Sequence, residues 1–233
     1  MAKARSRLWT VVILLLMAAA IVVAGARLGV IPEAYNPLAP IDLRDPPNAI
    51  TTAKLWIMQG HFPACVSALR RAGVAVRPMP FQSERPGCSR EGTVLISKLS
   101  RAGLAPEEMK CDVALRLYLL ERHGIQPLAR RQLGSEVDRI SHFGSYACRN
   151  KRGGSSLSEH ASANAFDISG FKLANGRMVT LKKDWTSGGP SARFLRDVRV
   201  KACRLFNMVL SPDYNADHAD HFHVDMGWII GCH

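Results

Sequence analysis

One long apolar stretch near the N-terminus, residues 8–26, contains no charged side chain. Its 19 residues just suffice to cross a bilayer as a helix, and they exceed the apolar region of an ordinary signal peptide. Because the preceding segment, 1–7, is basic, the positive-inside rule predicts that this segment is cytoplasmic, that 8–26 is a transmembrane anchor and that the remainder is exported. Cleavage after Ala24-Gly25-Ala26 is the alternative, although the length of the stretch favours a retained anchor.

The apolar periodicity is weak over the next segment, residues 27–53, which contains five prolines. This composition is typical of a semi-extended linker, and it predicts a spacer between the membrane and a folded domain over residues 54–233.

Within that domain, helical spacing of apolar residues occurs twice. Residues 106–123 are expected to form a helix that opens with two acidic residues and ends at Gly124, and a short helix should follow from Pro127 to Gly134. A second amphipathic helix is expected over residues 191–210, with these residues facing inward: Phe194, Leu195, Val198, Cys203, Phe206 and Val209.

Alternating or continuous apolar residues predict strands elsewhere. Residues 137–147 are expected to be extended, and the stretches AFDISGF (165–171) and HFHVDMGW (221–228) read as short strands. The sequence therefore predicts an α+β fold after the N-terminal helix, with a small antiparallel sheet that carries the polar residues of interest and packs against helices.

Six cysteines, an even number without a C-x-x-C pair, change the picture of this domain. In an exported protein they predict three disulfides, and fifteen pairings are open; the sequence-local pair Cys65–Cys88 is the pairing we expect first. Their spacing does not match a zinc ribbon or finger, so we do not expect a cysteine–zinc site.

The chain is also basic, with 31 Lys and Arg against 19 Asp and Glu and a formal net charge of +12. Such a balance predicts an acidic partner: a nucleic acid, an anionic lipid or an acidic polymer. Export argues against nucleic acid and leaves the membrane surface and an acidic polymer.

The candidate chemistry lies in two short segments. His221 and His223 are two residues apart in an expected strand, so both imidazoles should face one side. Asp167 follows His160 at a distance of seven positions in the sequence. The small residues between them let both side chains reach one point. We predict a Zn²⁺ site with the ligands His160, Asp167 and His223, because two imidazoles and a carboxylate leave one position open for water.

Two further residues are candidates for catalysis. Asp220, three residues before His223, could accept a proton from the attacking water, and Arg149 could hold an oxyanion or a substrate carboxylate. Asp220 would face away if the strand began earlier, and Arg149 could be a plain surface cation. His218 and Asp217 either support the ligands from behind or lie on the surface, and Asp225 either orients a ligand imidazole or caps a turn.

At this point the motifs resemble a known family. SEHASANAFD resembles the Ser-x-His-x-x-Gly-x-Ala-x-Asp signature of zinc D-Ala-D-Ala carboxypeptidases, and the later His-x-His is typical of the lysostaphin, D-Ala-D-Ala peptidase and hedgehog superfamily. GSYACRN (144–150), LSEHASANAFDISGF (157–171), ACRLFNMVLSPDYNADHADHFHVDMG (202–227) and the six-cysteine layout are most similar to the bacterial extensin-like C-terminal domain family, over about residues 60–232.

The resemblance implies a hedgehog and D-Ala-D-Ala peptidase-like fold and zinc on His160, Asp167 and His223. It also implies catalytic assistance from His221, a general-base position at Asp220 and a carboxylate-binding arginine at Arg149. Ala163 stands where the signature has Gly, so the backbone there should be unstrained or the loop should be shifted.

We therefore expect a single-pass protein of the bacterial inner membrane, or one released to the periplasm by cleavage, whose periplasmic domain is a zinc metallopeptidase or amidase of the D,D-carboxypeptidase or endopeptidase type. Its partner would be peptidoglycan stem peptides, and its oligomeric state is open. The alternatives are a non-catalytic, zinc-containing module that binds wall peptide and a metal-free structural envelope protein; the latter would leave His221 and His223 unexplained.

Overall fold

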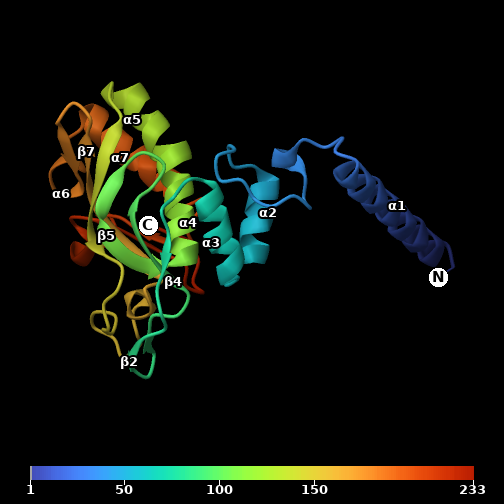
Figure 1. The fold of residues 1–233 in the computed structure, drawn as a ribbon, viewed down its shortest axis with the longest axis horizontal. Coiled ribbons are helices and arrows are strands. Elements are labelled where there is room, and N and C mark those ends of the chain that lie inside the picture. Colours follow the sequence, from blue (N-terminus) through green and yellow to red (C-terminus); the bar gives the residue numbers. More distant parts are fainter. Residues whose placement is uncertain (1) are drawn as a thin grey trace. The chain divides into compact units, whose positions relative to one another are not determined.

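A computed structural model describes residues 2–233, so Met1, the first residue of the expected segment 1–7, lies outside the described residues. The chain divides into two compact units, Met1–Ile57 and Met58–His233. Colours in Figure 1 follow the sequence from the N-terminal unit in blue to the C-terminus in red.

The N-terminal unit contains α1 (Ala2–Arg27), the 3-10 helix η1 (Glu33–Tyr35) and most of α2 (Ala49–Met58). Within α1, the span Arg7–Arg27 contains an 18-residue window with a mean hydropathy of 2.7 and is long enough to cross a membrane, which fits an anchor or a signal sequence. The proline-rich segment is less extended than expected. The side chain of Asn36 donates to the carbonyl of Ala26 (3.0 Å) and accepts from the backbone of Leu38, so the chain folds back onto the end of α1.

The second unit is built on one sheet, which has nine strands within the described residues. Its order is β1-β4-β5-β6-β7-β10-β9-β11, and β8 pairs with β7. The strands are β1 (Arg77–Pro78), β4 (Thr93–Lys98), β5 (Gly103–Lys110), β6 (Val137–Gly144), β7 (Ala165–Leu173), β8 (Met178–Thr180), β9 (Met208–Leu210), β10 (Phe222–Asp225) and β11 (Gly231–Cys232).

The mixed α+β class is confirmed, but the sheet is larger than expected and is not purely antiparallel. The pairs β5–β6 and β9–β11 run parallel. A separate hairpin is formed by β2 (Ser83–Arg85) and β3 (Cys88–Ser89). The three stretches expected to be extended are strands β6, β7 and β10.

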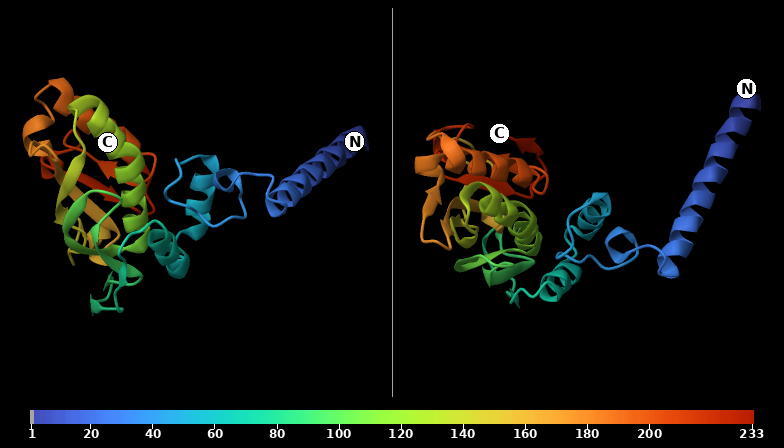
Figure 2. Two further views of the ribbon diagram at one scale, coloured as in Figure 1. Left: turned by 45° about the horizontal axis from the view of Figure 1, so that its top comes forward. Right: turned by 90° about the horizontal axis from the view of Figure 1, so that it is seen from above.

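Helices cover the sheet along one side (Figures 1 and 2). Helix α4 (Cys111–Leu120) packs on β4 and β5, and α5 (Gln126–Leu133) packs on α7 (Gly189–Ala202). Phe194 of α7 meets Phe171 of β7 edge to face, with ring centroids 5.3 Å apart. The remaining helices are α3 (Phe62–Arg71), η2 (Glu121–Ile125), η3 (Glu159–Ser162), α6 (Leu181–Asp184) and η4 (Ala216–His218).

The helix expected over residues 106–123 is wrong at both ends. Residues 103–110 form β5, in which Met109 is fully buried opposite Val94 of β4, so tertiary pairing overrides the helical pattern. At the other end Gly124 does not stop the helix. The π-helical turn η2 carries the chain on into α5, and such a turn accommodates Pro127, which lacks an N–H and would clash in a regular α-helix.

The helix expected over residues 191–210 is also too long, because α7 ends at Ala202. Cys203 is then tied to Cys232, and Val209 lies in β9 opposite Val224 of β10. Val209 is buried as expected, but on a strand.

The cysteines form three disulfides, as predicted: Cys65–Cys111, Cys88–Cys148 and Cys203–Cys232. The expected pair Cys65–Cys88 is wrong. Cys65 lies on α3, which packs against α4, and the first residue of α4 is its partner Cys111. Cys88 lies on the β2–β3 hairpin instead. Sequence proximity therefore does not decide the pairing.

Strand β8 approaches β7 closely at Gly170, and a substitution of this residue tests that contact. A Cβ atom there would lie 2.8 Å from the carbonyl oxygen of Val179 and 3.2 Å from Cα of Thr180. We expect Gly170→Ala to lower the free energy of unfolding by about 1–3 kcal/mol, because backbone must move to make room. Denaturation followed by far-ultraviolet circular dichroism measures this. Gly154→Ala, whose Cβ would meet only a carbonyl at 3.8 Å, is the control; equal losses in both variants would contradict the prediction.

Candidate metal centre

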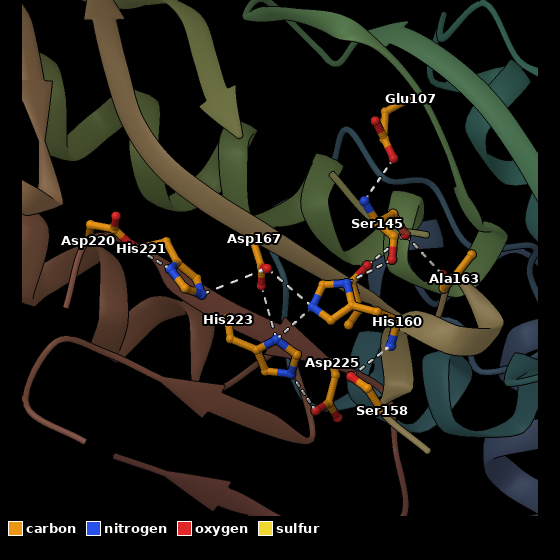
Figure 3. A network of polar contacts seen from close by, with 11 residues as sticks. Glu107, Ser145, Ser158, His160, Ala163, Asp167, Asp220, His221, His223 and Asp225 are labelled. Atoms are coloured by element: carbon orange, nitrogen blue, oxygen red, sulfur yellow. Dashed lines mark hydrogen bonds and ion pairs between the residues drawn. The ribbon is translucent and has the colours of Figure 1, made fainter. Parts of the chain in front are cut away.

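Three elements bring the predicted ligands together (Figure 3). His160 comes from η3, Asp167 from β7 and His223 from β10. The two strands are antiparallel neighbours, and His223 stands directly opposite Asp167. Alternation along each strand turns Phe222 and Val224 into the apolar core, so the polar side chains share the other face.

The short helix η3 explains the spacing of seven residues between His160 and Asp167. Ser158 caps it by accepting the backbone N–H of His160, and Ala163 ends it in the left-handed conformation (φ 53°, ψ 26°). Ala163 is the one non-glycine residue with positive φ in the described part of the chain. The backbone expected to be unstrained at this position is therefore strained, and the loop follows the turn that a glycine would favour.

The donor atoms of His160, Asp167 and His223 all lie within 4.8 Å of one another, and the three residues are buried. Nε2 of His160 is 3.2 Å from Oδ2 of Asp167, and Nδ1 of His223 is 3.0 Å from Oδ1. The two ring nitrogens are 3.1 Å apart. One carboxylate and two imidazoles thus converge on one point.

The other nitrogen of each imidazole supplies a test of whether a metal fits. Nδ1 of His160 donates to the carbonyl of Ser145 (2.7 Å), and Nε2 of His223 donates to Asp225 (2.9 Å). A carbonyl only accepts, so a neutral His160 directs its lone pair from Nε2 toward Asp167. Such outward partners are typical of metal-binding histidines, because they fix the tautomer and the ring orientation. The donor set therefore fits a divalent metal such as zinc.

Electrostatics within the group are strong. Burial alone would raise the pKa of Asp167, but the two neighbouring imidazoles, of His160 and His223, outweigh it and hold the pKa well below its usual range. Burial likewise would lower the pKa of His223, but its bonds to Asp167 and Asp225 raise it to about 9. The metal-free group is thus held together by a buried ion pair.

His221 lies just before β10 and faces the same carboxylate. Its Nε2 is 3.7 Å from Oδ2 of Asp167, while its Nδ1 is 2.9 Å from Oδ1 of Asp220. Asp220 therefore lies behind His221 rather than at the ligand group, and its side chain is 43% exposed. The exposed ring of Phe143 meets His221 edge to face.

The contacts described for Arg149 do not include one with His160, Asp167 or His223. The residue is exposed, and the hydrogen bonds described for it use its backbone, to Ala147 (2.8 Å) and from Ser158 (3.1 Å). The disulfide of Cys148 fixes the neighbouring backbone.

His218 belongs to the site more closely than the sequence indicated. Its ring lies 5.2 Å from that of His221 and 5.9 Å from that of His223. Burial and these two neighbours lower the pKa of His218 to about 4. Its position in the run H-A-D-H-F-H was the signal.

Ser145 and Glu107 were missed altogether. The backbone N–H of Ser145 donates to Glu107 (2.7 Å), and its hydroxyl donates to the carbonyl of Ala165 (2.6 Å) at the start of β7. Ser145 thus fixes the carbonyl that holds His160 (Figure 3). Nothing local in the sequence marks Glu107, which was assigned to a helix.

The comparisons support the resemblance to the extensin-like family. A family described as the extensin-like protein C-terminus matches residues 63–233. The match covers most of the chain, which therefore belongs to the extensin-like C-terminal family. Neither a curated protein nor a solved structure shows a significant match.

Ala163 generates a stability prediction. Ala163→Gly should change the free energy of unfolding by less than about 1 kcal/mol, because relief of the left-handed conformation offsets the entropy of glycine and the lost methyl contacts. Ala161 is equally buried but lacks a positive φ. Ala161→Gly should therefore cost about 1–2 kcal/mol. Equal losses in the two variants, measured by denaturation, would refute strain at Ala163.

The raised pKa of His223 predicts the pH dependence of metal affinity. Below pH 9 the metal-free residue keeps a proton, which also stabilises the fold below its ordinary pKa of 6.5 and ceases to do so as the pH rises through 9. Zinc must displace this proton, so its affinity should rise about tenfold per pH unit from roughly 6.5 to 9. Competition with a chromophoric chelator measures it. Asp225→Asn should shift the rise to lower pH; a flat profile in the wild type contradicts the prediction.

Proposed function

We propose that this extensin-like family member is a membrane-anchored, zinc-dependent peptidase or amidase that acts on peptidoglycan stem peptides in the periplasm. The observation that carries the proposal is the arrangement of four side chains. Three form the convergent donor set of His160, Asp167 and His223, and the fourth, His221, faces the same carboxylate from the adjacent position.

A zinc ion held by this donor set would lower the pKa of a water molecule and polarise the carbonyl of a peptide bond. Within the chain, His160 and His223 are kept in the ligand orientation by Ser145 and Asp225. The chain's own residues thus supply the positioning that a metallopeptidase site requires.

His221 is the residue placed to move a proton. Its Nδ1–H donates to Asp220, which leaves Nε2 as the acceptor on the side of Asp167. Asp220 then acts as a positioning residue for the imidazole and not as the base itself, which revises the role expected from the sequence. General-base assistance of this kind typically contributes about 10²–10⁴-fold to the rate.

The substrate class rests on charge and topology. The unit 58–233 has 25 Lys and Arg against 16 Asp and Glu, which suits the carboxylates of peptidoglycan stems. The N-terminal helix would hold the domain on the periplasmic side of the inner membrane, with segment 1–7 in the cytoplasm. The resemblance of SEHASANAFD to the signature of zinc D-Ala-D-Ala carboxypeptidases supports hydrolysis.

A second candidate function is a non-catalytic, zinc-containing module that binds wall peptide. It is favoured by Arg149, because the hydrogen bonds described for this residue use only its backbone and do not position its side chain to hold a substrate carboxylate. Binding alone needs neither Arg149 nor His221 in the site.

The experiment that separates these functions measures zinc and turnover on one sample. Full-length protein in detergent should contain one zinc and release a defined product from muropeptides, read by mass spectrometry. His221→Ala should keep the zinc and lose at least about 10²-fold in rate, because only the proton acceptor is removed. Asp167→Ala should lose both.

His61→Ala, at an exposed position on the cap of α3, is the matched control and should change neither quantity. Zinc without any product in the wild type would overturn the peptidase and favour the binding module. Folded protein without zinc would overturn both functions.

A further inference from the structure

Three consecutive large apolar residues project into solvent in the turn between β10 and β11. Trp228 is 101% exposed, Ile229 63% and Ile230 84%. We call residues 228–230 the apolar loop. Scattered exposed apolar side chains are ordinary, but a contiguous group indicates a contact surface. Neither the fold nor the metal centre accounts for this group.

Hydrogen bonds and a disulfide fix the backbone at both ends of the apolar loop. The side chain of Asn207 donates to the carbonyl of Gly227 (2.7 Å), and the backbone N–H of Gly231 donates to the carbonyl of Asn207 (2.9 Å). Beyond it, Cys232 is bonded to Cys203. The backbone at both ends of the loop is therefore fixed, and its three side chains project into solvent.

The chain itself indicates what covers this surface. Residues 7–27 form a helix of bilayer length, and the segment 28–57 joins it to the domain. A tethered domain meets its target at an effective concentration on the order of millimolar, so a small patch suffices for contact. Trp is the residue that favours the headgroup boundary, where its apolar ring and polar N–H are both satisfied.

Charge near the apolar loop agrees with a lipid surface. Lys201 lies two residues before Cys203 and Arg204 directly after it, and Cys203 is bonded to Cys232, so the disulfide joins two cations to the chain that ends the loop. Cations beside an exposed Trp and Ile pair are typical of segments that lie on anionic membranes.

We propose that the apolar loop inserts into the boundary of the membrane that holds the N-terminal helix, giving the domain a second membrane contact. The inference rests on the membrane anchorage in the proposed function. It also concerns the metal centre, since Gly227 donates to Asp225 (2.8 Å), the partner of His223. The second contact would thus hold the metal centre close to the bilayer surface.

Tryptophan quenching tests the proposal in the full chain. Trp9→Phe with Trp56→Phe leaves Trp228 and the buried Trp185, which is an internal reference. The protein is reconstituted into phosphatidylethanolamine and phosphatidylglycerol vesicles that carry bromine near the headgroups. We expect total emission to fall by about half relative to unbrominated vesicles, because a boundary Trp contacts the quencher. Adding Trp228→Phe should abolish that fall.

Replacement of Ile229 and Ile230 by Ser should reduce the quenching of Trp228, whereas Phe81→Ser, at an exposed apolar position near the β2–β3 hairpin, should not. Equal quenching with and without the two Ile would overturn insertion. A separate variant that keeps Trp9 and lacks Trp56 and Trp228 reports on the N-terminal helix.

Quenched Trp9 with unquenched Trp228 would overturn the second contact and leave the anchor intact. Quenched Trp228 with unquenched Trp9 would support the contact and refute the anchor. Two unquenched residues would overturn both. A concentration-dependent blue shift of unquenched Trp228 would instead assign the apolar loop to contact between copies of the chain.

Discussion

The register between β7 and β10 is the constraint on which the metal centre depends. It sets His223 opposite Asp167, and the same register sets Val224 opposite Phe166 in the core. A slip by one residue would turn every side chain of β10 to the other face. It would expose Val224 and bury an imidazole among aromatic side chains. The burial of Phe166, Phe222 and Val224 therefore protects the geometry of the ligands, and the apolar core and the polar site are two consequences of one pairing.

Ser145 ties the third predicted ligand, His160, to the same sheet. His160 lies on a single short helical turn, which alone would orient its ring poorly. Ser145 follows the end of β6, and its hydroxyl bonds to β7 while its N–H bonds to Glu107 of β5. The carbonyl that accepts from His160 is thus fixed by three neighbouring strands. All three predicted ligands inherit their positions from the sheet, which supports a preorganised group better than loops would.

The sequence predicted the residues that depend on local pattern and missed those that depend on distant contacts. Period-two alternation located β7 and β10, and the same alternation placed His221 and His223 on one face. The strand β5 was missed because its pairing with β4 outweighs the helical spacing of Val113, Leu117 and Leu120, which begins only at α4. Glu107 lay in that misassigned segment, so its contact with Ser145 could not be foreseen. The disulfide pairs were missed for the same reason, since helix packing and hairpin placement decide them.

The buried carboxylates at the site bear on which kind of ion the site would hold. Asp167 and Asp225 are 7% and 6% exposed, and both contact His223. Two buried carboxylates and one protonated imidazole leave an excess negative charge, and burial makes such an excess costly. A divalent cation, with the imidazoles neutral, balances the two carboxylates. Asp225 also accepts the N–H of Gly227, whereas Asp167 is the carboxylate on which both predicted histidine ligands converge. The acid behind His223 therefore balances charge as well as orienting the ring, which explains why a group with one ligating carboxylate contains two buried ones.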